Sequence, residues 1–207
     1  MPGFSKLKEN EREQRRDIII KAAVKLFEEK PFHEIGMRDI AEETDIVAGT
    51  IYRYFSSRDE LFVEALIQNI KDIEHIYEKR IEEARDSVSE LAIGVVDYLL
   101  DNEATFQMIS HFMINREIKP ETLEKFNAVQ RYFLKIFDNV MIREGASEEI
   151  RLITHAFFAS LNGIVMTFRN YPGRSKEDIR KHMHRLALLT ASMFETGIQS
   201  AHTKKKE

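Results

Sequence analysis

The chain has 207 residues, 43% of them hydrophobic and 32% charged, so it is long enough to bury a core and too apolar to be disordered. It contains no cysteine, which excludes a disulfide framework, a thiolate metal site and a cysteine nucleophile. The net charge is −4, and the first 58 residues carry 11 Lys or Arg against 11 Asp or Glu. Bulk charge therefore gives no argument for a nucleic-acid partner.

The sequence also lacks targeting and membrane signals. The first 16 residues mix Lys, Glu and Arg and have no apolar stretch like that of a signal peptide. No segment reaches the roughly 18 uninterrupted apolar residues that indicate a transmembrane helix. We therefore expect a cytoplasmic protein that does not enter a membrane.

The first predicted element is an amphipathic helix over residues 16–30. Its apolar residues recur at the spacing of one helix face, and Pro31 ends the run. The charged residues before it, 1–14, are expected to form a flexible, solvated arm.

Three further helices are predicted in the next part of the chain. Two are short, over residues 37–43 and 48–55. Ser57 then stands three residues before Glu60, a capping-box spacing that predicts the start of a long helix reaching to about Arg85.

The remainder of the chain predicts helices only, about nine in all with no strand, so the expected fold class is all-α. The cap and turn signals that separate these helices are Ser87, Asp101-Asn102, Lys119-Pro120, Gly145 with Ser147, and residues 171–175.

Two of the later helices, over residues 150–170 and 179–198, are apolar on more than one face. This is typical of helices that pack both on their own subunit and on a partner, and Gly163 would let a partner helix approach closely. We therefore expect a homodimer. The residues expected at or near its interface are Phe158, Leu161, Val165, Leu186, Leu189, Thr190 and Met193.

The most informative stretch is residues 37–58, MRDIAEETDIVAGTIYRYFSSR. Two short helices joined by a tight turn favour a helix-turn-helix, in which the second helix enters the major groove of DNA. Small residues at its start leave room for the backbone to approach base edges, and the aromatic and basic residues after them can reach phosphates. The alternative is that the two helices simply pack within a helical domain. The candidate DNA contacts are Ala48, Gly49, Thr50, Tyr52, Arg53, Tyr54 and Arg58.

The segment from about Arg15 to Leu66 resembles the N-terminal domain of the TetR family of bacterial transcriptional regulators. The matching stretches are AAVKLFEEK in the first helix, RDIA from Arg38, GTIYRYF from Gly49, and Arg58 just before ELF. The resemblance implies a helix-turn-helix DNA-binding domain over residues 1–57 and a helical ligand-binding and dimerisation domain over residues 58–207.

The resemblance also implies roles for individual residues at the operator. Thr50, Tyr52, Tyr54 and Arg58 would contact the DNA backbone, and Arg38, Ala48, Gly49 and Arg53 are candidates for contacts to bases. Arg16, the basic residue nearest the first helix, is a further candidate contact.

Three positions depart from the family pattern. Gly36 stands where a Thr cap is common, but glycine is an acceptable N-cap. Asp45 stands where the turn usually has Gly, but Asp tolerates a left-handed conformation. Val47 replaces a Ser or Thr cap, and the loss of such a cap costs about 1 kcal/mol.

The C-terminal helices contain aromatic, Met and amide side chains that suit a small apolar or amphipathic effector, although the same residues build ordinary cores. No metal site and no other cofactor are expected. The candidate effector contacts are Phe106, His111, Phe112, Asn115, Phe133, Phe137, Phe158, Asn162 and Met166.

These observations predict a repressor that binds a palindromic operator in double-stranded DNA as a homodimer and is released by its effector. No nucleophile elbow, glycine-rich phosphate loop or HExxH motif indicates an enzyme. Two alternatives remain: a helical interaction protein that has lost operator binding, and a small-molecule-binding protein or enzyme whose helix-turn-helix is incidental.

Overall fold

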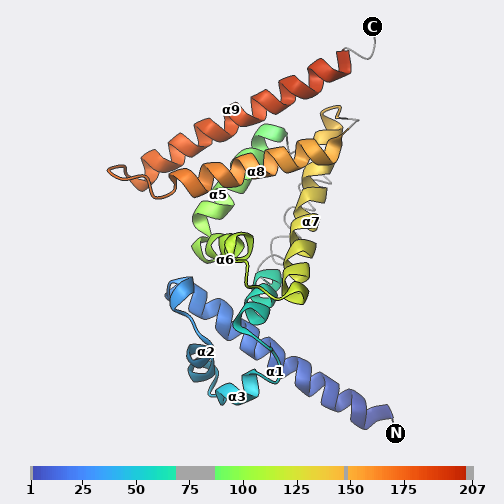
Figure 1. Cartoon of the computed structure of the whole chain (residues 1–207), viewed down its shortest axis with the longest axis vertical. Helices are drawn as coiled ribbons and strands as arrows, with labels where there is room; N and C mark the ends of the chain where they lie inside the picture. The colour runs from blue at the N-terminus through green and yellow to red at the C-terminus, as the bar shows by residue number, and fades with distance from the viewer. Residues whose placement is uncertain (1, 69–86, 147–148, 204–207) are drawn as a thin grey trace. The chain divides into compact units, whose positions relative to one another are not determined.

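The computed structural model describes residues 2–68, 87–146 and 149–203, and within these ranges every regular element is a helix (Figure 1). The predicted all-α fold is confirmed. The part of the predicted long helix that covers residues 69–85 lies outside the described residues. The elements are α1 (Pro2–Glu29), η1 (Phe32–Glu34, a turn of 3₁₀ helix), α2 (Met37–Thr44), α3 (Ala48–Ile51), a helical segment over residues 58–68, α5 (Val88–Asp101), α6 (Glu103–Ile114), α7 (Pro120–Arg143), α8 (Ile150–Phe168) and α9 (Lys176–Thr203).

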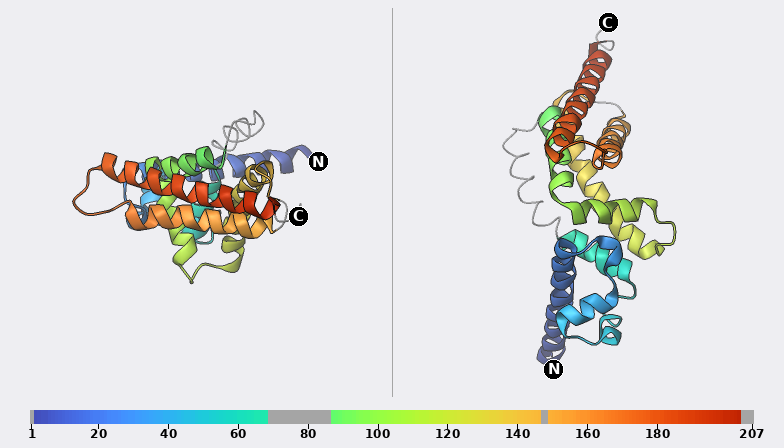
Figure 2. Two further views of the ribbon diagram at one scale, coloured as in Figure 1. Left: turned by 90° about the horizontal axis from the view of Figure 1, so that it is seen from above. Right: turned by 90° about the vertical axis from the view of Figure 1, so that its left-hand side faces the viewer.

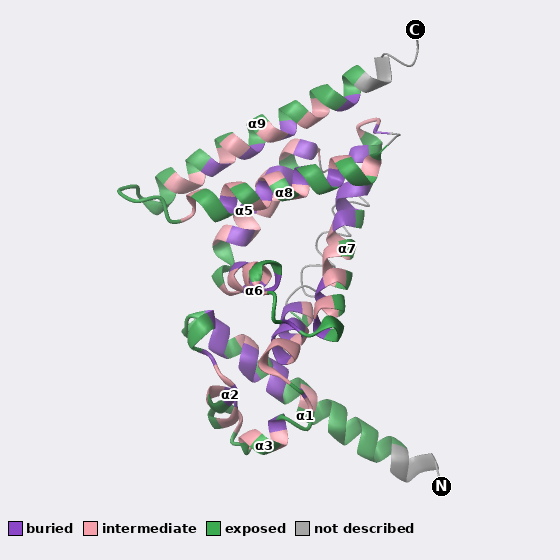
Figure 3. Ribbon diagram, in the orientation of Figure 1, coloured by how far each residue is buried: buried purple, intermediate pink, exposed green. Residues whose placement is uncertain are grey.

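The first helix is longer than the sequence predicted. α1 begins at Pro2, not near Arg16, so most of the expected flexible arm is helical in the structure. The side chains of residues 6–15 are exposed (green in Figure 3), whereas Ile19 is fully buried. Residues 6–15 contain many strong helix formers and no Gly or Pro, so the helix extends beyond the part that packs on a core.

Three serine caps predicted from the sequence form as expected. The hydroxyl oxygens of Ser57, Ser87 and Ser175 each accept a hydrogen bond of 3.1 Å from the backbone N–H three residues further on. Each bond satisfies a donor that the first turn of a helix otherwise leaves without a partner.

The chain divides into two compact units. The first holds the described residues up to 68 together with Ala104–Phe126, and the second holds residues 87–103 and the described residues from Asn127 onward. The predicted boundary after residue 57 therefore falls inside the first unit. The helical segment 58–68, most of α6 and the first turns of α7 belong with the N-terminal helices.

The core of the first unit is a cluster of aromatic rings. The Phe62 ring centroid lies 4.9 Å from that of Phe27 and 4.8 Å from that of Phe32, and all three side chains are buried. Two polar contacts tie α6 to this cluster. The Phe32 N–H donates to Gln107 Oε1 at 3.0 Å, and His111 Nε2 lies 2.9 Å from Asp59 Oδ1.

In the second unit α9 packs against α5 and α8, and Figure 2 shows α8 and α9 running side by side. Leu161 and Val165 of α8 and Ala187 and Ala191 of α9 are fully buried. The small alanine side chains let the two helix backbones come close together.

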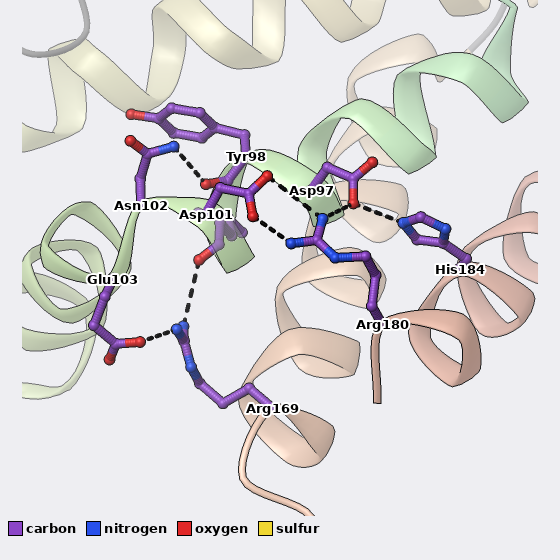
Figure 4. Close-up of polar contacts among 9 residues, drawn as sticks. Asp97, Tyr98, Asp101, Asn102, Glu103, Arg169, Arg180 and His184 are labelled. Carbon is purple, nitrogen blue, oxygen red and sulfur yellow. Dashed lines mark hydrogen bonds and ion pairs between the residues drawn. The ribbon is translucent and has the colours of Figure 1, made fainter. Parts of the chain in front are cut away.

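An ionic cluster joins α5 to α9 (Figure 4). The guanidinium of Arg180 bonds to both Asp97 and Asp101, and His184 Nε2 lies 2.7 Å from Asp97 Oδ1. The two aspartates, four residues apart on α5, would repel each other without Arg180 between them. Among the described residues, no group of three or more His, Asp or Glu is placed to hold a metal ion.

α8 carries apolar side chains on its outer side as well as its inner side. By length and composition it could cross a membrane, which is weak evidence alone, and only 22% of its apolar stretch is buried within the chain. A set of exposed, uncharged residues on α8 and α9 is here called the α8–α9 face. A Cβ added to Gly163 would meet nothing within 4 Å, so this chain's own packing does not require glycine there. The α8–α9 face comprises the exposed residues Leu152, Ala159, Gly163, Met166, Leu189 and Met193.

Candidate nucleic-acid interface

α2 and α3 are joined by a tight left-handed turn at Asp45. This residue has φ 53° and ψ 32°, and its N–H donates to the Glu42 carbonyl at 3.3 Å. The next N–H, of Ile46, donates to the Ala41 carbonyl at 3.0 Å. Glycine is the usual residue in this conformation, and Asp is among the few others that adopt it. The left-handed turn predicted at Asp45 is therefore confirmed.

The two short helices begin without a side-chain hydroxyl cap. The extended Gly36 donates its N–H to Asp39 Oδ2 at 2.8 Å, and this bond, with that from Lys30, lowers the pKa of the Asp39 carboxyl. Val47, the residue before α3, makes no side-chain cap and is 78% exposed. As predicted, α3 starts without the help of a hydroxyl.

α3 is shorter than the predicted helix over residues 48–55. It ends at Ile51, after which a turn follows. Backbone hydrogen bonds nevertheless continue from Arg53 to Thr50 at 3.0 Å and from Phe55 to Ile51 at 3.0 Å. We refer to residues 48–55 as the α3 segment, because these bonds hold them as one unit.

The α3 segment has one buried side and one side open to solvent. Ile51 and Phe55 are fully buried, as is Ile40 of α2. Tyr52 and Arg53 are exposed. Ala48, Thr50 and Tyr54 are half-buried, and Arg38 of α2 is exposed. The segment is thus anchored by apolar side chains while its polar and basic side chains remain available for contacts.

Gly49 is exposed at the start of α3 and has no role in the packing of its own chain. A Cβ added there would meet nothing within 4 Å, and its φ lies outside the left-handed region. The missing side chain therefore makes room only for another molecule that approaches this backbone. A backbone position that must come close to base edges has this property.

Arg16 belongs to an ionic cluster beneath the α3 segment. Its Nη2 lies 2.8 Å from Glu64 Oε1, and its guanidinium lies over the Phe55 ring, 5.1 Å from the centroid. Lys125 Nζ of α7 contacts the same Glu64 oxygen at 2.7 Å and Glu60 Oε1 at 3.3 Å. Burial raises the pKa of Glu64, but the bonds from Lys125 and Arg16 outweigh it and hold the pKa below its usual range.

Replacing Glu64 should therefore destabilise the first unit in a pH-dependent way. Glu64→Gln should cost about 1–3 kcal/mol at neutral pH, because it removes the carboxylate that pairs with Arg16 and leaves Lys125 with Glu60 alone. A carboxyl whose pKa is lowered by folding contributes stability above its ordinary pKa and loses it as the pH falls. The gap between wild type and variant in urea unfolding should shrink below about pH 4. An equal loss for the exposed Glu28→Gln variant would contradict this account.

Arg58 faces the interior of the first unit. Its guanidinium lies over the rings of Phe62 and Phe32, at 5.3 and 5.9 Å from their centroids, and Nη1 donates to the Ile35 carbonyl at 3.4 Å. The loop that precedes α2 is therefore fixed by the basic residue expected to contact DNA.

The candidate effector residues fall into both units. Phe106, His111, Phe112 and Asn115 lie in the first, and Phe133, Phe137, Phe158, Asn162 and Met166 lie in the second. In the first unit, Phe106, His111 and Asn115 line a surface hollow of about 370 Å³ with Phe32 and Ile114. Phe112 and Phe137 are buried, Phe133, Phe158 and Asn162 are half-buried, and Met166 is exposed.

The candidate dimer residues divide by burial. Leu189 and Met193 are exposed, and Phe158, Leu186 and Thr190 are half-buried. Leu161 and Val165 are fully buried within a single chain, where a second chain has no access to them. They are core residues of the second unit, because they occupy the inner side of α8.

Two short helices, a left-handed turn between them and a solvent-facing polar side on the second helix define a helix-turn-helix DNA-binding protein. Residues 19–65 match the family of bacterial regulatory proteins described as the tetR family. Together with the helix-turn-helix geometry, this match supports a regulator of the TetR family.

Relatives of known name extend the similarity over most of the chain. The fatty acid metabolism regulator protein of Bacillus subtilis is 22% identical over 194 residues, covering 90% of this chain and 95% of that protein. A putative TetR-family regulator from Mesorhizobium loti superposes with a TM-score of 0.61 at 18% identity, covering 88% of this chain and 97% of that one. FadR of Bacillus subtilis, solved with stearoyl-CoA, gives a TM-score of 0.59 at 21% identity, covering 83% and 96%.

Proposed function

We propose that this chain is a cytoplasmic, homodimeric repressor that binds a palindromic operator through the α3 segment and is released by a small amphipathic effector. One observation carries it: Ile51 and Phe55 anchor the α3 segment while Tyr52 and Arg53 face solvent. A segment fixed in this way can enter the major groove without rearranging. Bound at an operator, the dimer would block transcription. No feature of the site calls for catalysis.

Within this proposal, each candidate residue has a part at the operator. Thr50, Tyr52 and Tyr54 contact phosphates, and Arg38, Ala48, Gly49 and Arg53 face base edges. Arg16 and Arg58 are already engaged inside the first unit, so any contact that they make with a phosphate competes with those internal bonds.

The dimer is proposed to form through the α8–α9 face. The residues that make up this face are exposed and carry no charge, and an exposed apolar patch often marks a site of protein association. Gly163 and Ala159 at its centre would let a partner helix approach closely. Half-buried Phe158, Leu186 and Thr190 are expected at its border, whereas Leu161 and Val165 are left out because the chain's own core covers them.

The effector is proposed to carry a long acyl chain. The full-length similarity to a fatty acid metabolism regulator and to a FadR that binds stearoyl-CoA supports this class. The hollow lined by Phe106, His111 and Asn115 has the apolar walls and few polar groups that suit an amphipathic molecule. The effector releases DNA only if it binds the DNA-free state more tightly than the DNA-bound one.

Selection of bound sequences from a random duplex pool at physiological salt tests the proposed function. A palindromic motif with half-sites about ten base pairs apart is the expected result. Stearoyl-CoA and stearate are then added to the selected duplex, and either should release it. A folded protein that enriches no sequence would overturn the repressor assignment, and enrichment without release would overturn the proposed effector class.

Arg53→Ala tests the contact to a base. If Arg53 contacts a guanine edge, the variant should lose about 1–3 kcal/mol of preference at one operator position and little elsewhere. Competition binding with singly substituted operators measures this. A uniform loss across all sequences would make Arg53 a phosphate contact. The exposed Lys21→Ala variant, which removes a charge from the outer side of α1, serves as the control.

A further inference from the structure

A second hollow lies at the turn between α8 and α9, entirely within the second unit. We call it the turn pocket, and its volume is about 470 Å³, within the range of small-molecule sites. None of its residues belongs to the α8–α9 face. It is lined by Phe168, Tyr171, Arg174, Lys181, His182 and Arg185, together with Asp178 and Ile179.

The turn pocket carries an excess of positive charge on a chain whose net charge is −4. Arg174, Lys181 and Arg185 face a single acidic residue, Asp178. The carboxylate of Asp178 accepts a hydrogen bond from the Ser175 hydroxyl at 2.7 Å, and this bond lowers the pKa of Asp178. Lys181 forms an ion pair with Glu177, with 2.5 Å between Lys181 Nζ and Glu177 Oε1. Arg174 and Arg185 make no hydrogen bond or ion pair with the described part of the chain, so both guanidinium groups are available to an anion.

The turn pocket also presents aromatic faces. The Phe168 ring centroid lies 6.2 Å from that of Tyr171 and 5.0 Å from that of the His182 imidazole. Phe168, which contacts both other rings, is half-buried, whereas Tyr171 is 49% exposed. An exposed tyrosine ring can stack on a planar heterocycle whatever its hydrogen-bonding edge.

Guanidinium groups beside an exposed aromatic ring suit a ligand that carries both a phosphate and a planar base. Guanidinium groups bind phosphate oxygens in a bidentate manner, and an exposed aromatic ring stacks on a nucleotide base. The hollow of the first unit differs, because Arg and Lys are absent from its lining. We propose that the turn pocket binds a nucleoside phosphate, with the phosphates on Arg174 and Arg185 and the base on Tyr171.

This chemistry has two sources: a free nucleotide, for which ADP is the probe, and the nucleotide end of coenzyme A or its thioesters. Binding at the turn pocket does not depend on the proposed acyl effector, since it requires only residues 168–185. If coenzyme A is the source, the pocket would distinguish a thioester from the free fatty acid.

Isothermal titration of the full-length protein with ADP, coenzyme A and stearate tests the proposal. The wild type should bind ADP and coenzyme A, and the pair Arg174→Gln and Arg185→Gln should weaken both at least tenfold. The pair Lys119→Gln and Lys135→Gln removes the same charge from exposed positions elsewhere and should stay within about twofold of wild type. Tyr171→Ala should weaken binding by roughly threefold to tenfold, and Tyr171→Phe should retain it.

The ligands separate the two sources. Equal affinity for ADP and coenzyme A indicates a free nucleotide, and clearly tighter binding of coenzyme A indicates a thioester; either result supports the pocket. No binding of ADP or coenzyme A at millimolar concentration, or unchanged binding in the Arg174 and Arg185 pair, overturns it. Stearate and operator binding, measured on the same variants, report on the proposed repressor function independently.

Discussion

Phe62→Ala should lower the free energy of unfolding by about 3–5 kcal/mol, a large part of the 5–15 kcal/mol typical of a domain. Phe62 is fully buried, and its ring contacts those of Phe27 and Phe32 at the centre of the first unit. The truncation would leave a cavity that these two rings, held by their own helices, can fill only in part. It would also remove the ring over which the Arg58 guanidinium lies.

Urea unfolding followed by far-ultraviolet circular dichroism measures this loss, because the chain has no tryptophan for fluorescence. The half-buried Phe133→Ala should cost clearly less. A loss below about 1 kcal/mol for Phe62→Ala would mean that the aromatic cluster is not the core of the unit.

Introducing charge into the α8–α9 face should separate the proposed dimer. Leu189→Glu with Met193→Glu places two carboxylates where the two copies would meet, and burying unpaired charges is costly. Both side chains are exposed in the single chain, at 59% and 67%, so the fold of each copy should survive. Operator affinity should fall by about two orders of magnitude or more, since each half-site is then bound without the other.

Analytical ultracentrifugation and operator titration check the two parts of this expectation. Lys135→Gln with Asn139→Glu alters charge by the same amount at exposed positions of α7 and should remain a dimer. A persistent dimer in the Leu189 and Met193 variant would place the interface elsewhere. A monomer with undiminished operator affinity would show that dimerisation does not serve DNA binding.

Local features of the fold could be predicted from the sequence, because their causes lie within a few residues. The caps at Ser57 and Ser87 follow from a carboxylate three residues on, and the left-handed Asp45 follows from the short break between two apolar patterns. The start of α1 could not be predicted in this way. A mixed run of Lys, Glu and Arg suits both a solvated arm and an exposed helix, and its helix propensity decided the outcome.

Contacts between distant parts of the chain were beyond prediction. Glu64 and Lys125 lie 61 residues apart, and no local pattern connects them. On α8, apolar residues surround the helix, so periodicity does not tell which side faces the chain's own core. For this reason the pattern predicts Leu161 and Val165 at or near the dimer interface with Met193, although both are buried within the single chain.

The separation of buried and exposed residues within the α3 segment affects how such a regulator can change during evolution. Ile51 and Phe55 are fully buried and anchor the segment, while the side chains of Tyr52 and Arg53 are exposed to solvent. Exposed substitutions of this kind usually alter stability by less than about 0.5 kcal/mol. Mutations there can drift freely without unfolding the protein. If these residues recognise the operator as proposed, new operator sequences can be acquired one residue at a time on an unchanged scaffold.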